Sequence, residues 1–181
     1  MKAKNGLASN HPVWPAAKPG FFSPSAAVAG MQAVQKSLIE LLEYAAPQRI
    51  RLGLENRYHS LEFPLPDALE ILLGLAGADQ NGLIFDYSHA IALDRLGFVP
   101  RMAWLDRFSM RIVGTHIHDI RGATDHLAPG RGRVNFGQIA SYLPENAFGR
   151  CELQTINTPE MRKAGMMMLT GMGCVQKFSR D

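Results

Sequence analysis

Histidines and aspartates gather in one stretch of this chain, between residues 86 and 132. Four of the six histidines lie there, each after or inside an apolar segment that is typical of a strand. The stretch contains residues 86–89 (Asp-Tyr-Ser-His), 116–119 (His-Ile-His-Asp) and 125–132 (Asp-His-Leu-Ala-Pro-Gly-Arg-Gly). Imidazole and carboxylate groups are the side chains from which proteins build divalent metal sites. The stretch therefore indicates a metal centre.

The segments that must position these groups alternate between strand and helix. Apolar residues at helical spacing predict helices over residues 31–46, 66–76, 89–96, 101–109, 136–143 and 159–171. Short apolar runs predict strands over residues 49–55, 82–86, 111–118 and 149–155. Strands that alternate with helices pair in parallel and form a right-handed β/α architecture. Residues 1–30 are rich in proline, glycine and alanine and are predicted to be an irregular arm.

Each predicted strand ends in a group that can bind a metal or move a proton. Glu55, Asp86 and His116 end the first three strands, and Glu152 lies near the end of the fourth. Because active sites of β/α folds lie at the carboxyl ends of the strands, these groups can converge on one centre. Such a set suits Mn²⁺, Mg²⁺ or Zn²⁺ with positions left for substrate oxygens. A strand-end glutamate can also be a loop salt-bridge partner, and Asp86 can simply cap the next helix.

His116 and His118 carry a more specific signal, because alternate residues of a strand share one face. Two imidazoles on one face of a buried strand are costly without a partner. This spacing therefore favours contact with a metal or a substrate.

The bulk composition describes an ordinary globular chain. It has 181 residues, of which 46% are hydrophobic and 19% are charged, and one domain is expected. The formal net charge of +3 argues against nucleic acid as the main partner. Two cysteines are too few for a disulfide framework, and no run approaches membrane-spanning length. We therefore expect a cytoplasmic protein without a membrane partner.

Four motifs, in this order, resemble those of the sugar phosphate isomerase/epimerase family. These proteins are xylose isomerase-like TIM barrels related to endonuclease IV. The motifs are residues 54–57 (Leu-Glu-Asn-Arg), 85–90 (Phe-Asp-Tyr-Ser-His-Ala), 115–119 (Thr-His-Ile-His-Asp) and 125–132, and the resemblance spans roughly residues 31 to 175. It implies an isomerase that moves a proton at the carbon next to a carbonyl, with a divalent metal (Mn, Mg or Zn) and a small sugar or sugar phosphate as substrate.

The resemblance also assigns roles to single residues. Glu55 and Glu152 would be catalytic and would bind the metal together with Asp86 and His116. Substrate contacts would come from His89, His118, His126 and Arg131. A different register would make Gln154 the last metal ligand in place of Glu152. Glutamine cannot take up a proton at neutral pH, so that register would remove one acid/base group, and Glu152 is the preferred residue.

The chain supplies about half of the expected barrel. A complete (β/α)8 barrel needs roughly 250 residues, whereas four β/α units are recognisable here. The predicted fold class is therefore α/β, a partial (β/α)8 TIM barrel, with an irregular arm (residues 1–30) and a C-terminal half-barrel (residues 31–181). Because a half-barrel leaves two open strand edges, we expect a homo-oligomer or pairing with a missing N-terminal half.

Two other functions are compatible with the same motifs. One is an endonuclease IV-like zinc phosphodiesterase that acts on abasic DNA. The DNA-repair members have an aspartate two residues before the loop histidine, where this chain has Thr124. The other is a non-catalytic half-barrel that serves binding or assembly. The number of bound metals would separate these functions: one for the isomerase, up to three for the phosphodiesterase, and none for the assembly domain.

Overall fold

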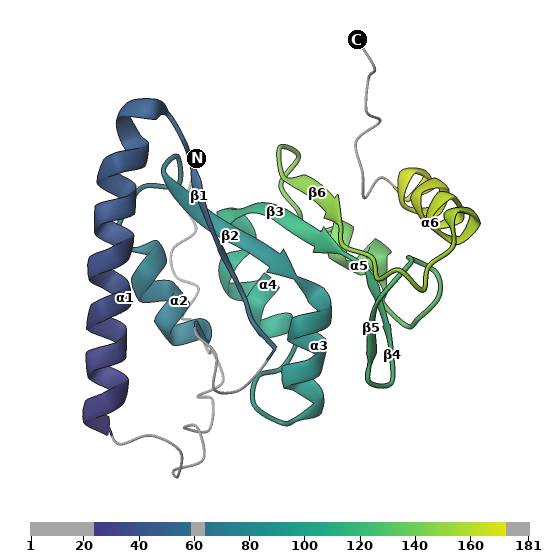
Figure 1. The fold of residues 1–181 in the computed structure, drawn as a ribbon, viewed down its shortest axis with the longest axis horizontal. Helices are drawn as coiled ribbons and strands as arrows, with labels where there is room; N and C mark the ends of the chain where they lie inside the picture. Colours follow the sequence, from purple (N-terminus) through teal and green to yellow (C-terminus); the bar gives the residue numbers. More distant parts are fainter. Residues whose placement is uncertain (1–23, 59–63, 173–181) are drawn as a thin grey trace, which may run out of the picture.

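A parallel sheet of four strands forms the centre of the computed structural model, which describes residues 24–58 and 64–172. The strand order is β1-β2-β3-β6 (Figure 1). The strands are β1 (Leu52–Glu55), β2 (Asn81–Asp86), β3 (Ile112–Ile117) and β6 (Phe148–Cys151). All three neighbouring pairs are parallel, so the carboxyl ends of the four strands meet at one edge of the sheet. The predicted α/β class with four parallel strands is confirmed.

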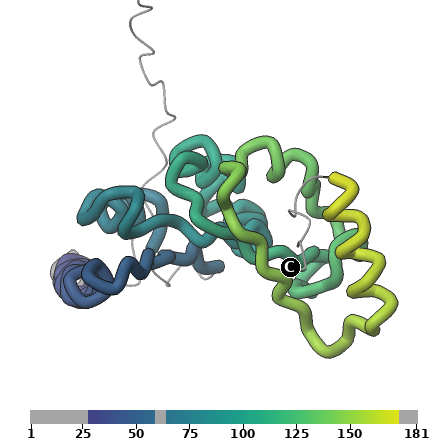
Figure 2. The backbone as a smooth tube through the Cα atoms, turned by 90° about the horizontal axis from the view of Figure 1, so that it is seen from above, coloured from purple at the N-terminus to yellow at the C-terminus, as the bar shows by residue number. Residues whose placement is uncertain are grey.

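In the part of the chain that the structure describes, six α-helices connect and cover the strands. They are α1 (Pro24–Ala45), α2 (Pro66–Leu73), α3 (Tyr87–Arg95), α4 (Met102–Phe108), α5 (Phe136–Ala140) and α6 (Pro159–Gly171). Two 3₁₀ turns, η1 (Ala46–Gln48) and η2 (Ser109–Arg111), lead into β1 and β3. Seen from above, α1 and α6 lie at opposite ends of the molecule (Figure 2). No helix in the described residues is long and apolar enough to cross a membrane.

The first helix begins earlier than its apolar spacing predicts. It starts at Pro24 rather than at residue 31, so residues 24–30 of the predicted irregular arm are helical. Proline is tolerated in the first turn of a helix, where its missing N–H needs no partner, and the alanines that follow favour a helix. The rest of the predicted arm, residues 1–23, lies outside the described residues.

A β-hairpin follows β3 where the sequence predicted neither a strand nor a helix. It consists of β4 (Asp119–Arg121) and β5 (Thr124–Leu127), which pair antiparallel. Its strands are too short for a period of two to be recognised in the sequence. Gly122, with a φ of 63°, provides the left-handed turn between them. The hairpin brings His126 back towards the end of β3.

The outer face of the sheet is packed under helices. Leu83 and Phe85 of β2 are fully buried there, and Ile112 of β3 is 2% exposed. They belong to one cluster with apolar residues of α2, α3 and α4, among them Leu69, Leu93, Trp104 and Leu105. The helix α1 packs separately, through Leu38 and Leu42 on Leu72 of α2. Burial of these side chains supplies most of the stability of the sheet.

The opposite face of the sheet is less covered. A Cβ atom at Gly114 would lie 2.5 Å from the ring of Phe148, so this glycine lets the ring lie across β3. Phe148 is still 54% exposed. This face is the one that would point into a barrel, where side chains of alternate strands pack in layers. The strand-end side chains on this face form the candidate site.

Candidate metal centre

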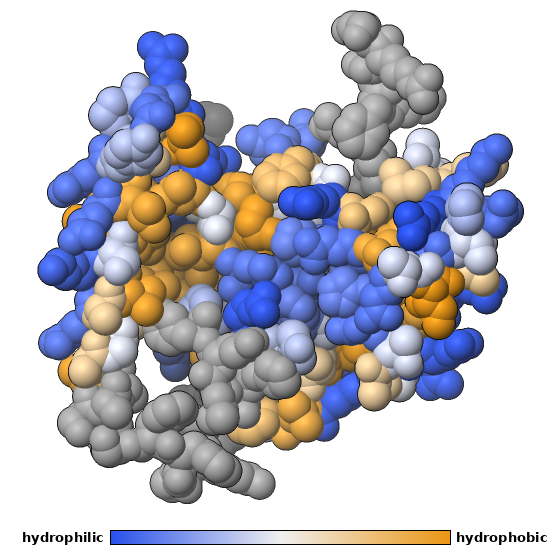
Figure 3. All heavy atoms as spheres, viewed as in Figure 1, coloured by the Kyte–Doolittle hydropathy of each residue, from blue (hydrophilic) through white to orange (hydrophobic). Residues whose placement is uncertain are grey.

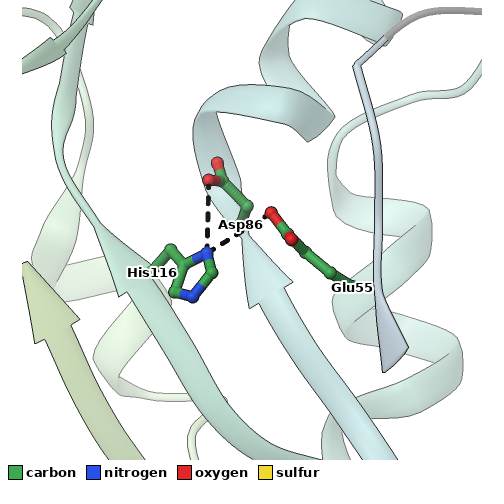
Figure 4. Close-up of side chains that lie close together, drawn as sticks. All are labelled: Glu55, Asp86 and His116. Carbon is green, nitrogen blue, oxygen red and sulfur yellow. Dashed lines mark hydrogen bonds and ion pairs between the residues drawn. The ribbon is translucent and has the colours of Figure 1, made fainter. Parts of the chain in front are cut away.

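Three neighbouring strands deliver one ligand-type side chain each to the same point. Glu55 ends β1 and Asp86 ends β2. His116 is the second-to-last residue of β3 and lies opposite Asp86 in the register. Their potential ligand atoms all lie within 4.8 Å of one another. His116 Nδ1 is 3.3 Å from Glu55 Oε1 and 4.0 Å from Asp86 Oδ2 (Figure 4). The parallel register thus gathers residues that are up to 61 positions apart in the chain.

Glu152 reaches the same imidazole from β6, the strand that pairs with β3 on the side away from β2. It follows β6, and its Oε2 atom lies 3.5 Å from His116 Nδ1 and 3.7 Å from His126 Nε2. Gln154 is exposed and donates a hydrogen bond from Nε2 to Asp125 Oδ1, at 3.3 Å. The structure therefore brings Glu152, and not Gln154, next to the ends of the other strands.

Asn56 fixes the main chain of Asp86. It is fully buried; its Oδ1 accepts from the Asp86 N–H at 2.7 Å, and its Nδ2 donates to the Asp86 carbonyl at 2.7 Å. This pair of bonds continues the β1–β2 ladder beyond its last backbone pair. The sequence analysis assigned Asn56 no role, although its place directly after a strand-end glutamate was a signal.

His89 is oriented by the same asparagine. Its Nδ1 atom donates to the Asn56 carbonyl oxygen at 2.8 Å. Its Nε2 atom lies 3.6 Å from Asp86 Oδ2. The Asp86 Oδ1 atom accepts from the His89 N–H at 3.0 Å and caps α3. His89 can offer a nitrogen ligand or accept a hydrogen bond at the edge of the cluster.

The other predicted substrate contacts occupy different environments. His118 has a fully buried side chain and donates from Nε2 to Asp86 Oδ2 at 2.9 Å. His126 is partly exposed and stacks on His118, with ring centroids 4.1 Å apart. Arg131 is exposed on the loop after β5. The hydrophilic centre of the face seen in Figure 3 is bordered by an apolar area towards α1.

Charge dominates the cluster. Burial raises the pKa of Glu55, but the hydrogen bond and charge of His116 outweigh it and lower the pKa. Burial likewise opposes ionisation of Asp86, and the hydrogen bond and charge of His118 and His89 hold its pKa below the usual range. The hydrogen bond to Glu55 raises the pKa of His116 against burial, and the charges of Glu152, Glu55 and Asp86 raise it further. The three carboxylates around His116 thus favour a positive charge at this point, on the imidazole or on a bound metal ion.

These donors fit a divalent metal. Ligands bound at about 2.1 Å lie roughly 3 to 4.3 Å from one another on one ion, and the distances of 3.3 and 4.0 Å at His116 fall in that interval. Two carboxylates and one imidazole, with Glu152 at the side, suit Mn²⁺, Mg²⁺ or Zn²⁺. A set without thiolates and with partly exposed members also leaves room for substrate oxygens.

Residues 7–171 match the family model of the xylose isomerase-like TIM barrel. A search of curated proteins finds no match.

Proposed function

Because the chain belongs to the xylose isomerase-like TIM barrel family, we propose that it carries the metal-binding half of a sugar isomerase or epimerase. The observation that carries this proposal is the convergence of Glu55, Asp86 and His116, with ligand atoms within 4.8 Å of one another. The proposed reaction is proton transfer at the carbon next to a carbonyl. The proposed substrate is a small sugar or sugar phosphate.

Two glutamates are the proposed proton carriers. Glu55 Oε1 and Glu152 Oε2 lie 3.3 and 3.5 Å from the same His116 nitrogen and come from different strands. The lowered pKa of Glu55 keeps it ionised at neutral pH, which is the state of a general base. One carboxylate would take the proton from the substrate carbon, and the other, carrying a proton of its own from solvent, would deliver that proton to the opposite face of the same carbon. A bound divalent metal would supply a Lewis acid for the carbonyl and hydroxyl oxygens.

The neighbouring groups would orient the sugar. The His89 Nε2 atom lies at the edge of the cluster and would contact a substrate hydroxyl. His126, stacked on the buried His118, presents a partly exposed ring beside Glu152. Arg131 could hold a phosphate or another anionic end of the substrate. His118 has no exposed side-chain surface, which argues for a role other than substrate contact.

The two outer strands of the sheet, β1 and β6, are proposed to pair with further strands. Within the described residues, β1 and β6 each pair on one side only. Four more parallel strands would close the barrel, either from a second copy or from an N-terminal half. Light scattering of the purified chain tests this: a dimer or a complex supports it, whereas a stable, cooperatively unfolding monomer contradicts it.

The experiment for function measures metal and proton transfer together. The purified chain is stripped with EDTA, titrated with Mn²⁺, Mg²⁺ and Zn²⁺, and incubated with aldoses, ketoses and their phosphates in D₂O. We expect about one metal per chain and deuterium at the carbon next to the carbonyl, detected by proton NMR. Glu55→Gln is the control that should abolish the exchange. Two or three bound zinc ions would instead indicate the phosphodiesterase, and no metal would indicate a non-catalytic domain.

A further inference from the structure

His118 lies between a metal-ligand candidate and the hairpin loop, and both of its ring nitrogens are engaged. Nε2 is 2.9 Å from Asp86 Oδ2, and Nδ1 accepts from the His126 N–H at 3.0 Å. The residue is 1% exposed, so water does not compete for either bond. The ring therefore joins the end of β2 to β5.

The second bond fixes the tautomer of His118. A peptide N–H can only donate, so Nδ1 must carry the lone pair and the proton must be on Nε2. The ring thus donates from Nε2 to Asp86 and accepts at Nδ1 from the His126 N–H.

The backbone of His126 makes this arrangement possible. Its φ is 52°, in the left-handed region that few residues other than glycine adopt, though histidine is among them. Its ring lies flat on that of His118, with an interplanar angle of 5°. Its carbonyl accepts from the Asn157 side chain at 2.8 Å and from the Gln154 N–H at 3.0 Å. The segment after β6 thus locks His126, and His126 locks the plane of the His118 ring.

We infer that His118 is a positioning residue, which holds the Asp86 carboxylate in its metal-binding orientation and couples that orientation to the seating of the hairpin loop. The inference rests on the proposed function, because it assigns His118 to the same metal site. With the His89 N–H on Oδ1 and the His118 Nε2–H on Oδ2, neither Asp86 oxygen can rotate away without losing a bond. Outer partners that orient metal ligands typically change metal affinity 10- to 100-fold when removed. His118 therefore acts through Asp86 rather than on the substrate.

Two substitutions at one position test the role. His118→Leu fills the space and removes both bonds, whereas the amide of His118→Gln can accept from the His126 N–H and donate to Asp86. We expect about a 10- to 100-fold weaker Mn²⁺ affinity in His118→Leu and recovery to within a few-fold of the native value in His118→Gln. Val99→Ala is the matched control, a buried substitution away from the cluster that should lower the unfolding temperature without changing the affinity.

Nitrogen NMR of the metal-free native chain provides a second measurement. The His118 ring should show a protonated Nε2 and an unprotonated Nδ1. Native affinity in His118→Leu, failure of glutamine to restore binding, or a protonated Nδ1 would each overturn this inference and leave the proposed function intact. Absence of Mn²⁺ binding in the native chain would instead overturn the proposed function, and the role of His118 with it.

Discussion

Two buried aspartates, Asp86 and Asp119, are held by this protein in opposite ways. Asp86 is fully buried and Asp119 is 1% exposed. The carboxylate of Asp119 accepts four backbone N–H bonds, from Ile120 and Val134 on Oδ1 and from Gly130 and Gly132 on Oδ2. That of Asp86 accepts one backbone N–H, from His89, and one imidazole N–H, from His118.

The difference separates a structural carboxylate from one that can bind a metal. A carboxylate offers about four lone-pair sites, so Asp119 is saturated and has none left for a metal or a substrate. Asp86 uses two of these sites and keeps the others. Peptide N–H groups hold their protons at any ordinary pH, whereas the imidazoles around Asp86 respond to pH and to cations. Asp86 and Asp119 each belong to one of the family motifs, so the sequence alone does not distinguish their roles.

The largest expected effect is on stability, from Asp119→Asn. The asparagine would turn an NH₂ group towards backbone N–H donors in a buried site. We expect the free energy of unfolding to fall by about 3 kcal/mol or more, because several bonds to a buried charge are lost together. Urea unfolding of the metal-free chain measures this. Asp79→Asn, at an exposed position, is the control, and equal stability of the two variants would contradict the structural role of Asp119.

Gly132→Ala tests the same loop with a milder change. A Cβ atom there would lie 2.2 Å from Asp119 Oδ1 and 2.5 Å from the Ile120 carbonyl oxygen, so either the loop or the carboxylate must move. We expect a loss of about 1 to 3 kcal/mol in unfolding free energy. Gly137 lies in α5, and a Cβ atom there would lie 3.6 Å from Asn135 Oδ1, an ordinary contact distance. Gly137→Ala should therefore be neutral or slightly stabilising. Similar thermal unfolding of both alanine variants would refute the close packing of this loop.

Glu55→Gln should show the opposite balance at the strand-end cluster. The side chain is 26% exposed and its ion pairs are partly solvated, so the unfolding free energy should change by less than about 1 kcal/mol. Mn²⁺ affinity should fall by about 100-fold or more, since a charged ligand becomes neutral. Calorimetric titration and urea unfolding of the same samples give both numbers. A variant that loses stability but keeps its Mn²⁺ affinity would place Glu55 with Asp119 rather than with Asp86.

In the pH range where His116 titrates, acidity should weaken metal binding while the protonation of His116 stabilises the metal-free fold. The raised pKa of His116 stabilises the metal-free fold below the ordinary value of 6.5, and this contribution is lost as pH rises through the raised pKa. The lowered pKa of Glu55 stabilises it above 4.5, and that contribution is lost as pH falls through the lowered pKa. A metal needs the neutral imidazole, so affinity should fall about tenfold per pH unit below the His116 pKa. Parallel metal titrations and melts measure the two pH dependences; a metal affinity that does not fall with acidity would exclude His116 as a ligand.

The sequence predicts the strand-end cluster because its signals are local. Each of Glu55, Asp86 and His116 ends an apolar run, and the alternation of strands and helices implies that these ends meet. Asp119 is bonded by the loop after β5, and Asn56 is bonded to Asp86, which lies 30 residues away. No short sequence pattern connects these segments. The bond from the His126 N–H to His118 could not be predicted, because the β4–β5 hairpin that returns His126 to this ring has no recognisable period.

The smallest expected effect decides between the two residues after β6. Gln154 is exposed, and its side chain bonds only to Asp125 among the interactions described for it, so Gln154→Ala should change Mn²⁺ affinity less than about twofold. Glu152→Gln removes a charge 3.5 Å from His116 Nδ1 and should weaken Mn²⁺ binding by at least about tenfold. Both variants keep the backbone bond from Gln154 to the His126 carbonyl, which isolates the side chains. If Gln154→Ala weakened Mn²⁺ binding more than Glu152→Gln, Gln154 would replace Glu152 as the last metal ligand. The second proton carrier would then have to come from the strands proposed to complete the barrel.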